Sequence, residues 1–204
     1  ARGVRLVAVS AVQFRSGLRM PLEAMAQRCR SRGAELFVDA IQGLGASPLH
    51  VDMGFDYLAS GGHKWLLGAE GAGLLYVRRE RMAGLTPSLA GWLGHEHAVD
   101  FLLRGAGHLN YDAPLRTDAE VFEPGTQNVL GYEALGVGIV PAEQLGVAAI
   151  HAHVNAYLDA LEPGGYSMTF VRRTMDDLRA INPEGRDEEK LFSTVAKHSE
   201  INMS

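Results

Sequence analysis

Two residues in the first part of the chain carry side chains suited to amine chemistry. Asp39 directly follows a short apolar run at 36–38, and Lys64 ends a glycine-rich string that begins at residue 61. A carboxylate at the carboxyl end of a sheet strand stands where open α/β sheets bind ligands. A lysine amine can act as a nucleophile toward a carbonyl group. Each also has a structural interpretation, the aspartate as a turn former and the lysine as a solvated surface group.

A second set of candidate residues lies in a loop rich in histidine and acid. His95, His97 and Asp100 have side chains of the types that zinc or manganese takes as ligands. In an extended segment, residues two apart point the same way, so His95 and His97 could share a metal. A metal-dependent hydrolase is therefore an alternative function. Solvated loop histidines are the structural interpretation of the same string.

The segments around Asp39 follow a strand-helix-strand pattern. The apolar runs at 6–10 and 36–38 are typical of strands buried on both faces of a parallel sheet. Between them, residues 22–32 show helical spacing, with arginines in the last turn and Gly33 as a stop. Two strands joined by such a crossover are parallel, so the sequence predicts an α/β fold with a mainly parallel sheet.

Further elements are expected along the rest of the chain. Apolar runs at 57–59 and 74–77 flank a glycine-rich stretch and extend the sheet. Residues 86–126 show little periodicity, which indicates long loops of the kind that are usually functional or disordered. Two helices broken near Pro141 are expected after them: 131–140 and 142–161.

Length, composition and charge fit a globular domain followed by a charged tail. Of the 204 residues, 47% are apolar, and the net charge of -5 leaves no basic excess for binding nucleic acid. No stretch approaches the roughly 20 apolar residues of a membrane span, so we expect no membrane partner. Cys29 is the only cysteine and cannot form an intramolecular disulfide, so we take a reducing cytoplasm as the default location. Beyond Gly165 charges of both signs dominate and apolar spacing weakens. This shift divides the chain into a domain at 1–164 and a tail at 165–204.

Several further motifs stand in a fixed order around Asp39 and Lys64. They are Ser10, Gly17 and Pro21, then Asp39-Ala40-Ile41-Gln42, Gly45, Pro48, Asp52 and Asp56, then Gly61-Gly62-His63-Lys64-Trp65-Leu66, Gly71, Gly73 and Leu75-Tyr76-Val77, and finally Gly91-Trp92 and Phe122-Glu123-Pro124-Gly125-Thr126-Gln127-Asn128. Over about residues 4–162, this order resembles the class V aminotransferase family of pyridoxal-phosphate enzymes. The resemblance implies part of the large domain of the fold-type I enzymes, with helices flanking the sheet.

The resemblance also implies a cofactor and roles for two residues. In the family, the residue that matches Lys64 forms the internal aldimine with pyridoxal 5'-phosphate, and the one that matches Asp39 pairs with the pyridine nitrogen. The chemistry requires both, because the lysine amine exchanges with the substrate amine and the carboxylate keeps the ring nitrogen protonated. The implied activity is that of a transferase or lyase acting on a small-molecule amino-acid substrate, in a homodimer.

Four more residues are assigned to the cofactor by resemblance alone. Gln42 resembles the residue that hydrogen-bonds the ring hydroxyl, and His63 the one that contacts the phosphate. Thr126 resembles a residue that reaches a phosphate across a dimer interface. Many family members have a serine where this chain has Gly61, so Ser60 is the candidate for that phosphate contact.

The chain departs from the family in ways that bear on its activity. The N-terminal phosphate-binding portion and the C-terminal domain of full-length relatives are not evident, so a non-catalytic, self-associating remnant is a further alternative. A cysteine desulfurase would need an exposed nucleophilic cysteine, whereas Cys29 lies on the apolar stripe of its predicted helix. The sequence Gly-Gly-His-Lys-Trp-Leu around Lys64 is closer to the epimerase-like and aminotransferase-like branches of the family than to the desulfurases.

Overall fold

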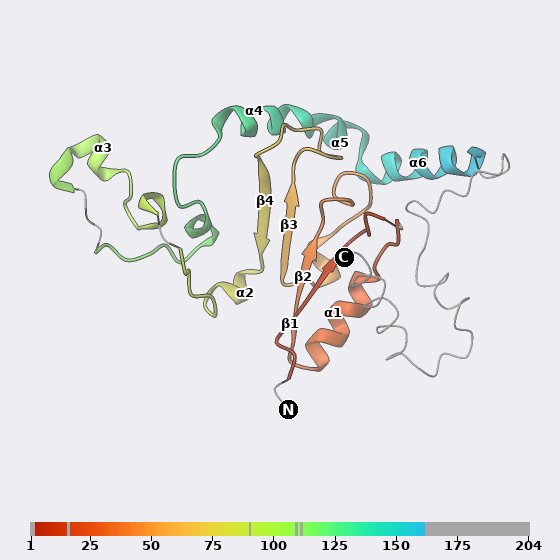
Figure 1. Cartoon of the computed structure of the whole chain (residues 1–204), viewed down its shortest axis with the longest axis horizontal. Coiled ribbons are helices and arrows are strands. Elements are labelled where there is room, and N and C mark those ends of the chain that lie inside the picture. Colours follow the sequence, from red (N-terminus) through yellow and green to blue (C-terminus); the bar gives the residue numbers. More distant parts are fainter. Residues whose placement is uncertain (1–2, 16, 90, 109, 111, 162–204) are drawn as a thin grey trace.

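A computed structural model describes residues 3–161, except Ser16, Ala90, Leu109 and Tyr111, and is built around a four-stranded sheet (Figure 1). The strands lie in the sheet in the same order as in the chain. Their bounds are β1 Leu6–Ser10, β2 Glu35–Asp39, β3 Tyr57–Gly61 and β4 Gly73–Val77. The first three strands are parallel, as predicted, and β4 pairs with β3 in the antiparallel direction.

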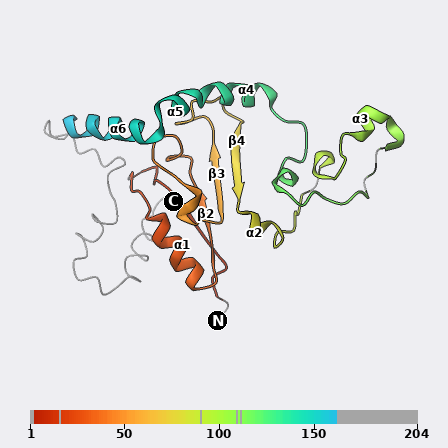
Figure 2. The same cartoon turned by 180° about the vertical axis from the view of Figure 1, so that it is seen from behind.

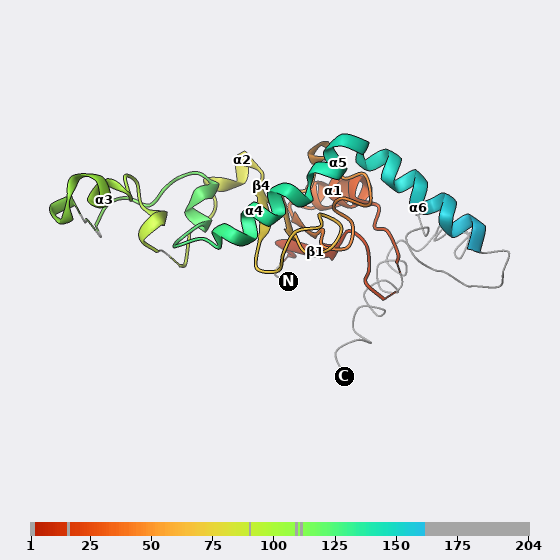
Figure 3. The ribbon, with the colours of Figure 1, turned by 90° about the horizontal axis from the view of Figure 1, so that it is seen from above.

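Helix α1, Leu22–Ser31, connects β1 to β2 and covers one face of the sheet (Figure 3). Its apolar stripe packs against strand residues such as Leu36 and Val38, which are fully buried. Burial of this kind stabilises a fold by about 25 cal/mol per Å² of apolar surface removed from water. The predicted strand-helix-strand unit is therefore confirmed, with Cys29 in its core.

The opposite face of the sheet carries Ser10, Asp39 and Ala59, which are paired across β1, β2 and β3. Paired residues of neighbouring strands point to the same face because side chains alternate along each strand. On this face Leu6 is 49% exposed and Leu75 is 43% exposed. Among the described residues, no helix covers this face of the sheet in the way that α1 covers the opposite face.

Asp56 connects the start of β3 to its neighbours on both sides. One carboxylate oxygen accepts a hydrogen bond from the Leu36 backbone N–H at 2.8 Å, and the other accepts one from Arg81 at 2.8 Å. Next to it, the Tyr57 hydroxyl donates to Glu35 at 2.9 Å. Burial, together with the bond to Glu35, raises the pKa of Tyr57 to about 12. Arg81 belongs to a short helix, α2 Arg79–Met82, that follows β4.

Three consecutive helices follow at the carboxyl-end side of the parallel strands, and the last extends beyond the sheet (Figures 1 and 2). They are α4 Val129–Gly138, α5 Val140–Leu145 and α6 Val147–Leu161. The predicted break near Pro141 falls at Ile139, between α4 and α5, and Pro141 lies in the first turn of α5, where the missing N–H costs nothing. The predicted helix 142–161 is interrupted at Gly146, whose φ of 78° is one that glycine adopts freely.

In the region predicted as long loops, 86–126, the described residues form short helical segments and an isolated bridge between His95 and Leu115. The helical segments are the 3-10 turns η2 Trp92–Gly94, η3 Ala106–His108 and η4 Ala119–Phe122, and helix α3 Asp100–Arg104. A further 3-10 turn, η1 Val51–Met53, precedes β3. The predicted tail at 165–204 lies outside the described residues.

No single helix in the described part of the chain is long and apolar enough to cross a membrane. One bent pair, Val129–Leu145 with Val147–Ala160, meets the criteria of length and composition when its two helices are taken together.

Candidate cofactor site at the carboxyl edge of the sheet

Asp39 ends β2 at the edge of the sheet where the parallel strands finish. Its side chain is exposed, and Oδ1 accepts a hydrogen bond from the Ile41 backbone N–H at 3.0 Å. The chain then makes a tight turn in which the Gly43 and Leu44 N–H groups both donate to the Ala40 carbonyl. The carboxylate thus has a fixed position, with its second oxygen open to a ligand.

Lys64 lies in the loop that follows β3, on the same edge. Two backbone hydrogen bonds close this loop, from Leu67 to the Lys64 carbonyl at 3.0 Å and from Gly68 to the Gly62 carbonyl at 2.9 Å. Helix α4 packs directly on it, since a Cβ added to Gly138 would lie 2.6 Å from the Leu66 carbonyl oxygen. The loop is therefore held between the sheet and α4.

The Asp39 turn and the Lys64 loop touch each other. A Cβ at Gly45 would lie 2.8 Å from the Trp65 carbonyl oxygen, and one at Gly61 would lie 2.9 Å from the His63 ring and 3.3 Å from Ile41. Only glycine fits at these two positions without displacing a neighbour. At Gly61, where many family members have a serine, a larger side chain would require the exposed His63 ring to shift.

Phe14 brings the loop after β1 to the same place. The Lys64 Nζ lies 5.5 Å from the centre of the Phe14 ring, a distance at which a cation and an aromatic face attract each other. Our sequence analysis missed this residue. Its signal was an aromatic side chain a few residues beyond the carboxyl end of a strand predicted to border the site.

Lys64 is also the one lysine in this part of the chain. The sequence contains three lysines, Lys64, Lys190 and Lys197, so residues 1–189 hold one primary amine on a side chain. That amine lies in a glycine-lined loop packed against the turn of Asp39. An amine, a carboxylate and an aromatic face together fit the ring end of pyridoxal phosphate.

The residues assigned to the ring hydroxyl and the phosphate of the cofactor differ in burial and in position. Gln42 is half-buried in the Asp39 turn, and His63 is exposed beside Gly61. Thr126 is exposed in the segment that leads into α4. Its contact across a dimer interface stays a prediction.

Ser60 does not fit the phosphate contact for which it was predicted. Its side chain is buried, and its hydroxyl donates to the Gly61 carbonyl at 3.0 Å. The reason is the alternation of side chains along β3, which turns Ser60 to the same face as Leu58, toward α1.

The histidine loop gives no support to the alternative metal site. Within the described residues, no three His, Cys, Asp or Glu side chains gather closely enough to hold a metal ion. His95 Nδ1 lies 2.6 Å from the Ala113 carbonyl, and Asp100 pairs with Arg104 at 3.3 Å. His97 has a positive φ of 54°, so the backbone here is not the extended segment that would align it with His95.

Fold and site together define a partial α/β domain that presents a lysine and a carboxylate at the carboxyl edge of its sheet. The profile of the family described as aminotransferase class-V matches residues 1–175. The chain belongs to this family, whose members are pyridoxal-phosphate-dependent enzymes of amino acids. The match passes the predicted boundary at 164.

Individual relatives agree with this family. An uncharacterized aminotransferase of Bacillus subtilis is 32% identical over 150 residues, which are 73% of this chain and 37% of the relative. A cysteine desulfurase of Klebsiella pneumoniae is 30% identical over 178 residues, 87% of this chain and 38% of the relative. The chain thus spans less than two-fifths of the length of these relatives.

A solved structure shows the same fold. The apo cysteine desulfurase of Thermococcus onnurineus superimposes with a TM-score of 0.64 and 30% identity, over 78% of this chain and 38% of the other. The predicted fold class, part of a fold-type I enzyme with a mostly parallel sheet and flanking helices, is confirmed.

Proposed function

We propose that this chain is the part of a pyridoxal-phosphate-dependent amino-acid enzyme that holds the cofactor through Lys64. The observation that carries the proposal is the packing of the Lys64 loop on the turn of Asp39, with the Phe14 ring 5.5 Å from the amine. Lys64 is the one side-chain amine among residues 1–189.

When bound, pyridoxal phosphate supplies an aldehyde that a lysine amine can attack and a ring that accepts electrons from the substrate carbon. Lys64 would provide the amine, and later pass a proton to or from the substrate carbon. Asp39 would hold a proton on the pyridine nitrogen, because an opposite charge favours the protonated form of a base.

The remaining contacts are proposed from the resemblance to the family. Gln42 would donate to the ring hydroxyl, and His63 and Thr126 would contact phosphate, Thr126 from the second subunit of a homodimer. Ser60 is left out because its hydroxyl already donates to Gly61.

The proposed substrate is an amino acid, and Cys29 has no role in its conversion. Its thiol is buried between α1 and the sheet, and burial, with a smaller effect of Asp56, raises its pKa. A raised pKa keeps sulfur in the protonated, unreactive form. Cys29 is therefore unsuited to serve as the nucleophile that a cysteine desulfurase needs.

Reduction with borohydride tests the role of Lys64. We expect the protein incubated with pyridoxal phosphate to turn yellow and, after reduction, to carry the label on the peptide that contains Lys64. Lys64→Ala should remove that label, whereas the double variant Lys190→Arg, Lys197→Arg should keep it. Asp39→Asn should retain the label but slow proton exchange at the substrate carbon, since an amide cannot hold the ring nitrogen protonated.

Label spread over Lys190 and Lys197 in preference to Lys64 would contradict the proposal. The chain would then be a non-catalytic remnant of the family, in which the inherited residues no longer form a site.

A further inference from the structure

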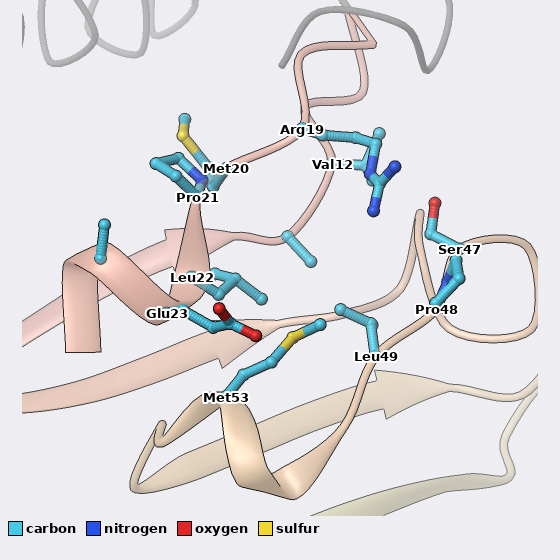
Figure 4. Close-up of a pocket in the computed structure, with 12 residues that line it drawn as sticks. Val12, Arg19, Met20, Pro21, Leu22, Glu23, Ser47, Pro48, Leu49 and Met53 are labelled. Atoms are coloured by element: carbon cyan, nitrogen blue, oxygen red, sulfur yellow. The ribbon is translucent and has the colours of Figure 1, made fainter. Parts of the chain in front are cut away.

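A pocket separate from the Lys64 site opens on the α1 side of the molecule (Figure 4). It has a volume of about 380 Å³ and lies between the start of α1 and the segment 47–53. None of the residues assigned above to pyridoxal phosphate lines it. Cavities of about 300–1,000 Å³ are the size that small organic ligands occupy.

Ser47 contributes a hydroxyl that lacks a partner. The residue is 2% exposed, and its Oγ has no hydrogen-bond partner in the described part of the chain. Buried polar side chains almost always have one, so this hydroxyl marks a place for a polar group that the pocket admits. A carboxylate oxygen would accept the hydrogen bond that the hydroxyl can donate.

Arg19 brings a positive charge to the same end of the pocket (Figure 4). Its Nη1 lies 3.1 Å from His151 Nε2, and His151 Nδ1 lies 3.2 Å from the carbonyl of Ala46, the residue before Ser47. Burial lowers the pKa of Arg19, and its side-chain hydrogen-bond partner in the described chain is a histidine, not a carboxylate. An anionic group in the pocket would supply the missing counter-charge.

The middle of the pocket is apolar, and its far end is acidic. Met20, Leu49 and Met53 line the middle, and thioether side chains adapt their shape to a ligand. Glu23, in the first turn of α1, is exposed at the end away from Arg19 (Figure 4). This order matches a ligand with a carboxylate at one end, an apolar body, and room for a cationic group at the other.

We propose that this pocket binds a small carboxylate with an unbranched apolar body, and that an ammonium group at the far end strengthens binding through Glu23. The carboxylate pairs with Arg19 and accepts a hydrogen bond from Ser47. The site is independent of the cofactor, because it lies on the face of the sheet that α1 covers.

Three probes separate the parts of this recognition. The whole chain is titrated with hexanoate, 6-aminohexanoate and hexanamide, and the backbone amide signals of Ala24, Ser47 and Met53 are followed by NMR. We expect hexanoate to bind saturably and hexanamide, which has no charge, to bind at least about tenfold more weakly. The advantage of 6-aminohexanoate over hexanoate should disappear in Glu23→Gln.

Variants test the two groups that hold the carboxylate. Arg19→Gln should weaken hexanoate binding about tenfold, and Ser47→Ala severalfold. Arg32→Gln, which removes an exposed charge just after the end of α1, serves as the matched control and should bind as the wild type does. Arg19 also bonds His151, so Arg19→Gln could fail to fold. In that case Ser47→Ala is the variant that tests the proposal.

The proposal is overturned if no probe shifts these signals saturably, which would mean that water alone fills the pocket. It is also overturned if Ser47→Ala binds hexanoate as tightly as the wild type. Lys64→Ala should bind hexanoate normally, so a failed cofactor assignment and a failed pocket assignment give different results.

Discussion

Asp56 is a single carboxylate that holds three elements together. It accepts hydrogen bonds from the backbone of β2 and from Arg81 of α2, while its own residue begins the turn into β3. Its two donors are a buried backbone N–H and a guanidinium, and the same guanidinium also pairs with Glu35 at 3.3 Å. The residue therefore belongs to the framework that fixes the strand ends, and its place in the family motif has a structural reason.

Replacing Asp56 by alanine should destabilise the protein by about 1.5–3 kcal/mol, the range for hydrogen bonds that involve a charged group. Urea denaturation measures the change in the free energy of unfolding. Asp52→Ala is the matched control, because Asp52 is exposed in the turn η1, and surface substitutions of this kind stay within about 0.5 kcal/mol. Equal effects of the two variants would show that the Asp56 bonds contribute nothing.

The sequence predicted that Asp39 and Lys64 lie at the carboxyl edge of the sheet, but it did not predict which side chains surround them. Their placement followed from apolar runs, since each lies just beyond one. Phe14 reaches Lys64 across a loop whose path depends on tertiary packing, which the sequence pattern does not contain. The misassignment of Ser60 was avoidable, because it lies two residues after Leu58 and so shares the buried face.

Helix α4 acts as an element that positions the Lys64 loop. Its glycines differ in what surrounds them: a Cβ at Gly138 would meet the backbone of Leu66 and Leu67 within 2.7 Å, while a Cβ at Gly136 would meet nothing within 4 Å. The close contact at Gly138 lets the helix lie directly on the loop backbone.

Gly138→Ala should therefore destabilise the protein by about 1–3 kcal/mol, the usual cost of overpacking. It should also reduce labelling of Lys64 by pyridoxal phosphate, because the loop must shift. Gly136→Ala is the control, and it should stabilise by about 0.5–1 kcal/mol, since alanine favours a helix over glycine. Thermal unfolding and quantified labelling measure both effects, and normal behaviour of Gly138→Ala would contradict the role given to α4.

Helix α6 is anchored through His151, whose ring must be neutral. Arg19 can only donate, so Nε2 accepts from it and the ring proton sits on Nδ1, facing the Ala46 carbonyl. Burial, with the charge of Arg19 as a second cause, lowers the pKa of His151 in the folded protein.

A lowered folded pKa means that the unfolded chain binds the proton more readily. The stability contributed by neutral His151 is therefore present above the ordinary histidine pKa of about 6.5 and is lost as the pH falls below it. We expect thermal unfolding to occur at a lower temperature at pH of about 5.5 than at about 7.5. The decrease should be smaller in His151→Gln and unchanged in His153→Gln, where the histidine is exposed. Identical pH profiles for all three proteins would contradict this account.

For the helices and strands, the spacing of apolar residues and the glycines that end elements decided what the sequence could predict. The strands β1 and β2 and the helix between them follow from apolar spacing and from Gly33. The direction of β4 did not follow from its own residues. It could have been inferred from the stretch before it, which lacks the helical pattern that a parallel crossover needs.

The whole molecule has one closed face and one open face. The face that α1 covers contains the core, and the other carries Asp39 together with Leu6 and Leu75, which remain substantially exposed. The family relatives are about twice as long as this chain. The division of the chain at residue 164 stays a prediction, and first cleavage after Gly165 in limited proteolysis would support it.

The order of the strands has a consequence for how the chain is made. Each strand pairs with the one that precedes it in the chain, from β1 to β4. During synthesis the N-terminal part of a chain is available to fold first, so β2, β3 and β4 can each pair with a strand that has already left the ribosome. Helix α4, synthesised well after β4, then closes on the loop behind β3. The nascent chain can thus assemble its scaffold first and fix its lysine last.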